Sequence, residues 1–133
     1  MDEERDELDD IFVDKNEPVD KKIIVEILKS YVTIDSEGVI SYNKSFEKLN
    51  ESKKVLIYLL CKKAIKIRGI EGIEEPSNLK EVVEKVMVSE SNAKNALFTY
   101  YKSIVKKEGN GYIIPNYNLG KVRGLIFKGK DDK

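Results

Sequence analysis

One side of the segment 90–106 carries amide, hydroxyl and ammonium groups and no carboxylate. If the segment is a helix, a step of about 100° per residue brings these groups together. The residues on this side are Ser91, Asn92, Asn95, Thr99 and Lys102, with Lys94 at the border. Asparagine amides can pair with adenine edges, hydroxyls can bond phosphates, and lysines neutralise phosphates. The side therefore has the chemistry of contacts to a nucleic acid.

The opposite side of the same segment is apolar, as expected of a helix packed on a core. Its members are Ala93, Ala96, Leu97, Tyr100, Tyr101 and Ile104, with Phe98 at the border. Ser89 is a good N-cap for this helix. A solvated face in a chain with 24 acidic residues would be expected to include some of them. The lack of acids on the polar side therefore favours a polyanionic partner.

The sequence also predicts a helix before this segment and a hairpin after it. Asn78 and Glu81 have capping-box spacing, and the apolar stripe that follows predicts a helix ending near Lys85. A short turn then leads to Ser89. After the long helix, Val105–Lys107 and Tyr112–Ile114 flank "EGNG". Its Gly109, Asn110 and Gly111 are able to adopt positive φ, so a hairpin is predicted.

This order of helix, turn, helix and hairpin resembles the winged helix-turn-helix superfamily. The stretch that carries the resemblance is "SNLKEVVEKVMVSESNAKNALFTYYKSIVKKEGNGYIIP", and the match widens to 53–117 if 53–67 is the first helix. The resemblance implies that 90–106 is the recognition helix and that the hairpin is a wing touching phosphate or minor groove. Lys106, Lys107 and Asn110 would contact double-stranded DNA there, although the tip has Glu108 and no arginine.

The remaining segments complete an α+β, mostly α, fold: a winged helix-turn-helix with an added N-terminal helix and hairpin and a C-terminal helix. We expect a helix over 21–31 capped by Asp20, strands near 32–34 and 39–42, and a helical turn in "KSFEKL". Ser52 is the expected cap of a nearly all-apolar helix over 53–67, which leaves a narrow stripe of Lys62, Lys63 and Lys66. A last helix over 117–127 either packs back on the domain or forms the seam of a homodimer.

The zero net charge hides an uneven distribution. Residues 1–20 contain ten acidic and two basic side chains, a net −8, so the other 113 residues carry +8. A basic part with an acidic tail indicates a polyanion partner, while a solvated lysine surface is the alternative. We predict a disordered tail over 1–19 and a single domain over 20–130. In the tail, Leu8, Ile11 and Phe12 either dock on a protein partner or the chain's own basic face, or belong to a solubilising segment.

The composition argues against several classes of protein. Histidine is absent, so the usual general base is missing, and we expect no enzyme, no cofactor and no metal site. We expect the lone Cys61 to be a small, buried hydrophobic residue. No run is apolar enough for a membrane span, so a cytoplasmic protein is expected, and the Lys/Glu-rich composition is archaeal-like. The predicted function is DNA binding, for example in transcription regulation; the alternative is a protein–protein adaptor that docks through its tail.

Overall fold

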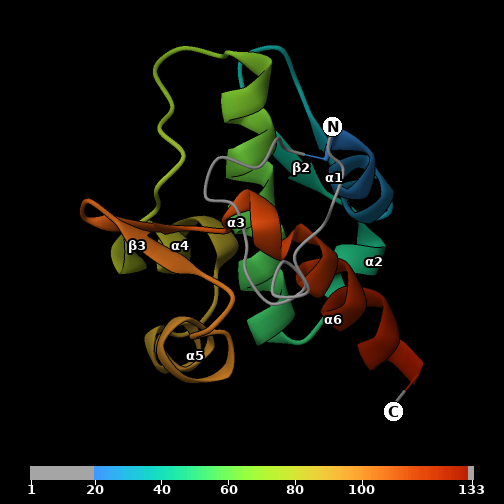
Figure 1. Cartoon of the computed structure of the whole chain (residues 1–133), viewed down its shortest axis with the longest axis vertical. Helices are drawn as coiled ribbons and strands as arrows, with labels where there is room; N and C mark the ends of the chain where they lie inside the picture. Colours follow the sequence, from blue (N-terminus) through green and yellow to red (C-terminus); the bar gives the residue numbers. More distant parts are fainter. Residues whose placement is uncertain (1–19, 132–133) are drawn as a thin grey trace, which may run out of the picture.

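The computed structural model describes residues 20–131, and this part of the chain is an α+β fold made mostly of helices with two antiparallel hairpins (Figure 1). The predicted class, α+β and mostly α, is confirmed.

The predicted tail over 1–19, with Leu8, Ile11 and Phe12, lies outside the described residues. Among residues 20–131, no helix has both the length and the apolar character needed to cross a bilayer. In chain order the elements are α1 (Lys21–Leu28), β1 (Val32–Ile34), β2 (Ile40–Tyr42), α2 (Lys44–Glu47), α3 (Glu51–Arg68), α4 (Leu79–Val86), α5 (Glu90–Asn95), η2 (Ala96–Tyr100), β3 (Lys106–Glu108), β4 (Gly111–Ile113), η3 (Asn116–Asn118) and α6 (Leu119–Asp131).

Helix α3 runs through the centre of the fold and contacts α1, α4, α5, η2 and β4 (Figure 1). Every side chain from 55 to 61 is buried, as its nearly all-apolar sequence predicts. Burial raises the pKa of Cys61 to about 12, so this thiol is a protonated core residue. The helix begins two residues earlier than predicted, because Asn50 and not Ser52 caps it: Lys53 N donates to Asn50 Oδ1 over 2.8 Å.

The narrow stripe of lysines on α3 is only partly at the surface. Lys62 and Lys63 are both buried, and only Lys66 is exposed. A buried ammonium is tolerated when carboxylates and other acceptors surround it. The partner carboxylates are Glu81 for Lys62 and Glu75 for Lys63, both brought in from outside α3.

The N-terminal elements match their predictions closely. Asp20 caps α1, and the first hairpin pairs Val32 with Tyr42 and Ile34 with Ile40. Helix α1 ends at Leu28, three residues before its predicted end, because the chain turns there into β1. The turn of the hairpin is fixed by Asp35, whose carboxylate accepts backbone N–H bonds from two later residues of the turn.

The C-terminal helix packs back on the domain. It begins with the short helix η3, and α6 then lies against α1 with Leu119, Val122 and Ile126 buried. Arg123 Nη1 lies 3.2 Å from Glu26 Oε1 of α1. Of the two predicted roles for this helix, packing on its own domain is the one observed; a homodimer seam stays a prediction.

Candidate nucleic-acid interface

Helices α4 and α5 are joined by a tight turn. One residue determines where α4 begins, another where it ends, and a third where α5 begins. Glu81 N donates to Asn78 Oδ1 over 2.8 Å at the start of α4. Met87 ends that helix in the left-handed region, with φ of 65°. Asn92 N donates to Ser89 Oγ over 3.1 Å and so starts α5. The two predicted caps are therefore confirmed, and the three residues 87–89 set the direction in which α5 leaves α4.

The predicted helix over 90–106 is shorter than expected, and its hydrogen-bonding pattern changes from α-helical to π-helical along its length. The α-helical part ends at Asn95 and continues as the π-helical segment η2, in which Tyr101 N donates to Ala96 O over 2.9 Å. An i→i+5 bond puts more residues into the turn than a 100° step assumes, so side chains after Ala96 shift around the axis. Tyr100, predicted on the inner side, is consequently 62% exposed, whereas Tyr101 is buried.

All nine predicted contact residues are exposed. They are Ser91, Asn92, Lys94, Asn95, Thr99, Lys102, Lys106, Lys107 and Asn110. On the helix, Ala93, Ala96 and Leu97 face the core behind them. Within residues 20–131, the side chains of Asn95 and Thr99 form no hydrogen bond with another described residue, so their polar groups are available to an external partner.

The polar side is not free of carboxylates, which corrects the sequence-based expectation. Asn92 Nδ2 donates to Glu51 Oε1 over 2.7 Å, and Ser89 N donates to the same oxygen over 3.3 Å. The hydrogen bond from Asn92 is the main reason that the pKa of Glu51 is lowered. On α5 itself, Glu90 lies 3.5 Å from Lys94. One acid therefore arrives from the start of α3, a place that the helical wheel cannot include.

The second hairpin follows η2, with both strands shifted by one residue from the predicted ends. Lys106 pairs with Ile113 and Glu108 with Gly111, and every residue of β3 is exposed. Only Gly109 of the tip has positive φ, 62°; Asn110 and Gly111 do not, contrary to prediction. Gly111 is needed for another reason: a Cβ there would lie 2.6 Å from Ser77 N.

The hairpin is held to the helices by two contacts. Ser77 and Tyr112 exchange backbone hydrogen bonds of 3.1 and 2.9 Å, so the segment before α4 pairs with β4. The ring of Phe98 in η2 meets the ring of Tyr112 edge-on at 5.7 Å. The strand that backs the exposed β3 is thus fixed relative to both α4 and η2.

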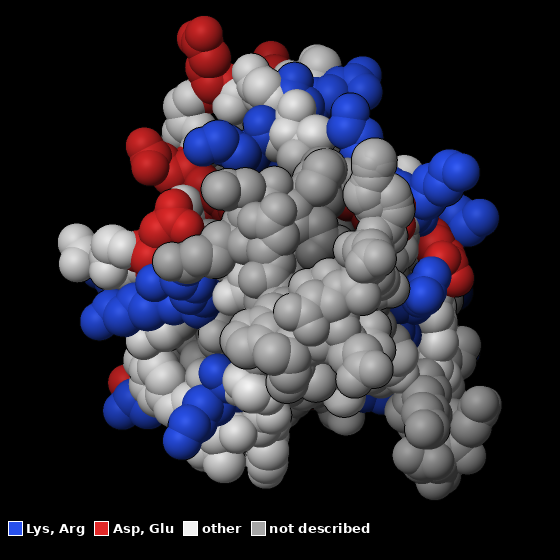
Figure 2. Space-filling view, viewed as in Figure 1, with Lys and Arg blue, Asp and Glu red and all other residues white. Residues whose placement is uncertain are grey.

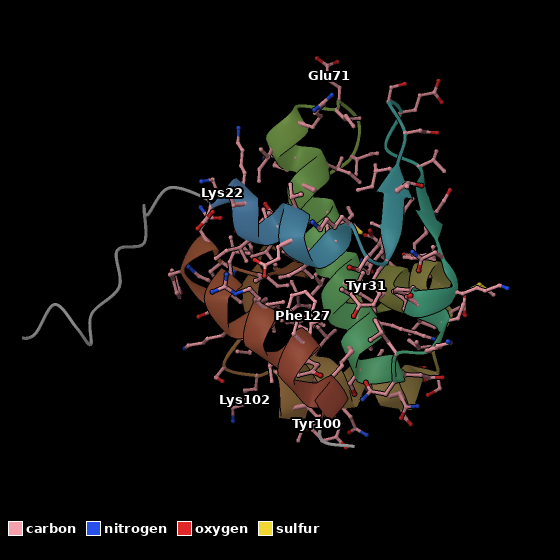
Figure 3. All side chains as sticks on the ribbon, turned by 90° about the vertical axis from the view of Figure 1, so that its right-hand side faces the viewer. Lys22, Tyr31, Glu71, Tyr100, Lys102 and Phe127 are labelled. Atoms are coloured by element: carbon pink, nitrogen blue, oxygen red, sulfur yellow. The ribbon has the colours of Figure 1, made fainter. Side chains whose placement is uncertain are left out.

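Basic and acidic side chains are unevenly distributed around α5 and the second hairpin. In Figure 2, lysine atoms gather over β3 and beside α5 in the lower left of the view, and carboxylates gather above them. Figure 3 places Lys102 and Tyr100 at one end of the molecule and Glu71 at the other. On this face the exposed lysines of the helix and hairpin lie together, although Glu90 is beside Lys94 and Glu108 is on the same strand as Lys107.

A buried polar network under the hairpin was missed by the sequence reasoning. Lys62 Nζ donates to Ser77 Oγ over 3.0 Å and to Glu81, and Tyr58 OH donates to Glu81 Oε2 over 2.6 Å. Burial alone would raise the pKa of Glu81, but the hydrogen bonds from Lys62 and Tyr58 lower it by more, so the net direction is down. The network ties α3 to the residue that pairs with β4. The only signal in the sequence was the position of Lys62 on an otherwise apolar helix.

No protein-family model, curated protein or solved structure matches the chain. The case for a function therefore depends on the exposed side chains, their spacing and their charge.

Proposed function

We propose that the chain is a double-stranded-DNA-binding protein of the winged-helix type, suited to transcription regulation. The observation that carries the proposal is that all nine side chains with nucleic-acid chemistry stand exposed on α5, η2, the turn after them and the second hairpin. Since Ala93 and Ala96 are buried on the inner side of this helix, its exposed amide and hydroxyl groups project away from the core.

The order and packing of the elements support the winged-helix assignment. Helices α3, α4 and α5 contact one another in pairs, and the hairpin β3–β4 follows the third of them. In such a domain the third helix enters the major groove and the hairpin lies beside it. Here α5 and η2 would read the groove, and β3 would approach the phosphates.

Each class of side chain has a distinct role in this proposal. Lys94, Lys102, Lys106 and Lys107 would supply sequence-independent affinity by displacing counterions from phosphates. Asn95, which has no partner within the described residues, would pair with a base edge. Asn92 would have to exchange its bond to Glu51 for a base contact, and therefore contributes less.

A binding titration by fluorescence anisotropy tests the proposal. A labelled random duplex is titrated with the full chain at several salt concentrations. Phosphate contacts from these four lysines predict that log K falls with log salt with a slope of roughly −3 to −4. No binding to duplex at low salt, or an affinity independent of salt, would refute the proposal.

A further inference from the structure

A cleft of about 920 Å³ has a lining that includes none of the lysines proposed to contact phosphates. Its walls are the first hairpin, the segment 72–78 and the tip of the second hairpin at 108–111. The volume is at the upper end of the range of about 300–1,000 Å³ that is usual for sites of small organic molecules. The cleft is therefore large enough for a ligand and small enough to be selective.

The lining of the cleft includes the carboxylate of Glu81, one oxygen of which takes part in several hydrogen bonds. Tyr58 OH, Ser77 Oγ and Lys62 Nζ all donate to Oε2 of Glu81. Within residues 20–131, Oε1 of Glu81 accepts no hydrogen bond from another described residue. The donors also fix the orientation of the carboxylate, so the second oxygen is a preorganised acceptor.

The charge of the lining is negative. Glu37, Glu74 and Glu108 line the cleft together with Glu81, against the two lysines Lys62 and Lys85. Among the described residues, the three outer carboxylates have no lysine or arginine within salt-bridge distance. Since Lys62 is already paired with Glu81, the lining as a whole favours a cation and disfavours an anion.

The rest of the wall is apolar. Ile40, Ile65, Ile73 and Pro76 line the cleft beside the ring of Tyr42. Such a surface favours a ligand with a hydrocarbon or aromatic body. No group of acidic residues or cysteine within residues 20–131 has the arrangement of a metal site, which argues against a bare metal ion as the occupant.

We propose that this cleft binds a small organic amine. Its protonated amino group faces Oε1 of Glu81, and its apolar body lies against Ile65 and Ile73. The bound molecule also contacts Gly109 and Asn110 at the tip of the hairpin. The inference goes beyond the proposed DNA binding and does not depend on it, because it needs no nucleic acid and, of the nine proposed DNA contacts, only Asn110 also lines the cleft.

Amide chemical shifts of the ¹⁵N-labelled full chain test this inference, with phenethylamine as the probe. Phenylpropionate, an anion, and phenethyl alcohol, which is neutral, are the matched analogues. We expect saturable shifts at Ile40, Ile73 and Gly109 with a dissociation constant of about a millimolar, a reasonable affinity for so small a ligand. The alcohol should bind more weakly and the carboxylate not at all.

Two double variants distinguish binding of phenethylamine in the cleft from a general attraction between the cationic probe and the carboxylates of the chain. Glu37→Gln/Glu74→Gln removes two unpaired rim charges and should weaken phenethylamine binding by about threefold to tenfold. Glu84→Gln/Glu90→Gln removes the same charge outside the cleft and should leave the affinity unchanged. Shifts that do not saturate, an equal response to phenylpropionate, or equal affinities for the two variants would overturn the inference.

Discussion

Asn92 Nδ2 donates a hydrogen bond to Glu51 Oε1 over 2.7 Å, so a side chain predicted to contact bases is already paired with a carboxylate. The same oxygen accepts from Ser89 N at the cap of α5. Glu51 therefore holds the start of the exposed helix against α3, and it also places a negative charge where phosphates would approach. Under the proposed function these two effects oppose each other, and they are separable by mutation.

Glu51→Gln should strengthen duplex binding by about threefold at low salt, because one repulsive charge is removed from the interface. Glutamine retains a side-chain oxygen that accepts the bonds from Asn92 and Ser89. The measurement is the dissociation constant by anisotropy. Glu71→Gln is the control, since it removes a charge from the opposite end of the molecule (Figure 3). Equal effects of the two variants would show that only net charge matters.

Asn95→Ala should relax the preference for the selected DNA site by roughly 1–3 kcal/mol, the worth of a bidentate base contact. Binding to random duplex should change little, because the lysines remain. A site first has to be selected from a random library, and the affinities of the selected and scrambled duplexes are then compared. Thr33→Ala, an exposed polar change on β1, is the matched control. An unaltered ratio of affinities in Asn95→Ala would remove this residue from the interface.

Features set by neighbouring residues could be predicted from the sequence. Asp20, Asn78 and Ser89 each cap the helix that their side chain precedes, because an N-cap needs only an acceptor within three residues. The first hairpin was predicted for the same reason, since β-branched runs flank a turn sequence. The exposure of Ser91, Asn92, Lys94 and Asn95 follows from helical periodicity, which holds as far as Ala96.

Features set by distant partners could not be predicted. Glu51 is 41 residues away from Asn92, and Lys62 is 19 residues away from Glu81. A helical wheel treats each lysine on α3 as solvent-facing, because it has no information about a carboxylate from another element. The π-helical turn after Ala96 has no cue in residue type, and it is the reason that Tyr100 is exposed.

Glu81→Gln should lower the free energy of unfolding by about 2–3 kcal/mol, because it leaves the ammonium of Lys62 buried without its charge partner. Lys62→Met should cost less, since it removes the buried charge and leaves Glu81 partly exposed. The double variant should recover stability relative to Glu81→Gln alone. Urea unfolding at neutral pH measures all three, and additive losses would contradict the coupling.

The same pair predicts a dependence on pH. The folded pKa of Glu81 is below its ordinary value of 4.5, so its contribution to stability is complete above that value. It is lost as the pH falls through the lower folded pKa. The wild-type chain should therefore lose more stability on acidification than Glu81→Gln does. Parallel curves of unfolding free energy against pH would contradict this.

Deleting residues 1–19 should tighten duplex binding severalfold, because the segment carries most of the net −8 charge of residues 1–20 and is tethered to a basic domain. Leu8→Ala/Ile11→Ala/Phe12→Ala keeps every tail charge and tests apolar docking separately. If competition is electrostatic, only the deletion tightens binding. An unchanged affinity after deletion would rule out a tail that competes with DNA.

The salt dependence of duplex binding in two charge variants tests the central claim most directly. Lys94→Gln/Lys102→Gln/Lys106→Gln/Lys107→Gln neutralises the proposed interface, and Lys21→Gln/Lys22→Gln/Lys29→Gln/Lys66→Gln neutralises four exposed lysines elsewhere. The interface variant should flatten the slope of log K against log salt by about 3–4, at roughly 0.9 per lost phosphate contact. The control variant should keep the slope of the unmodified chain. Equal slopes for the two variants would contradict an interface formed by α5, η2 and the second hairpin.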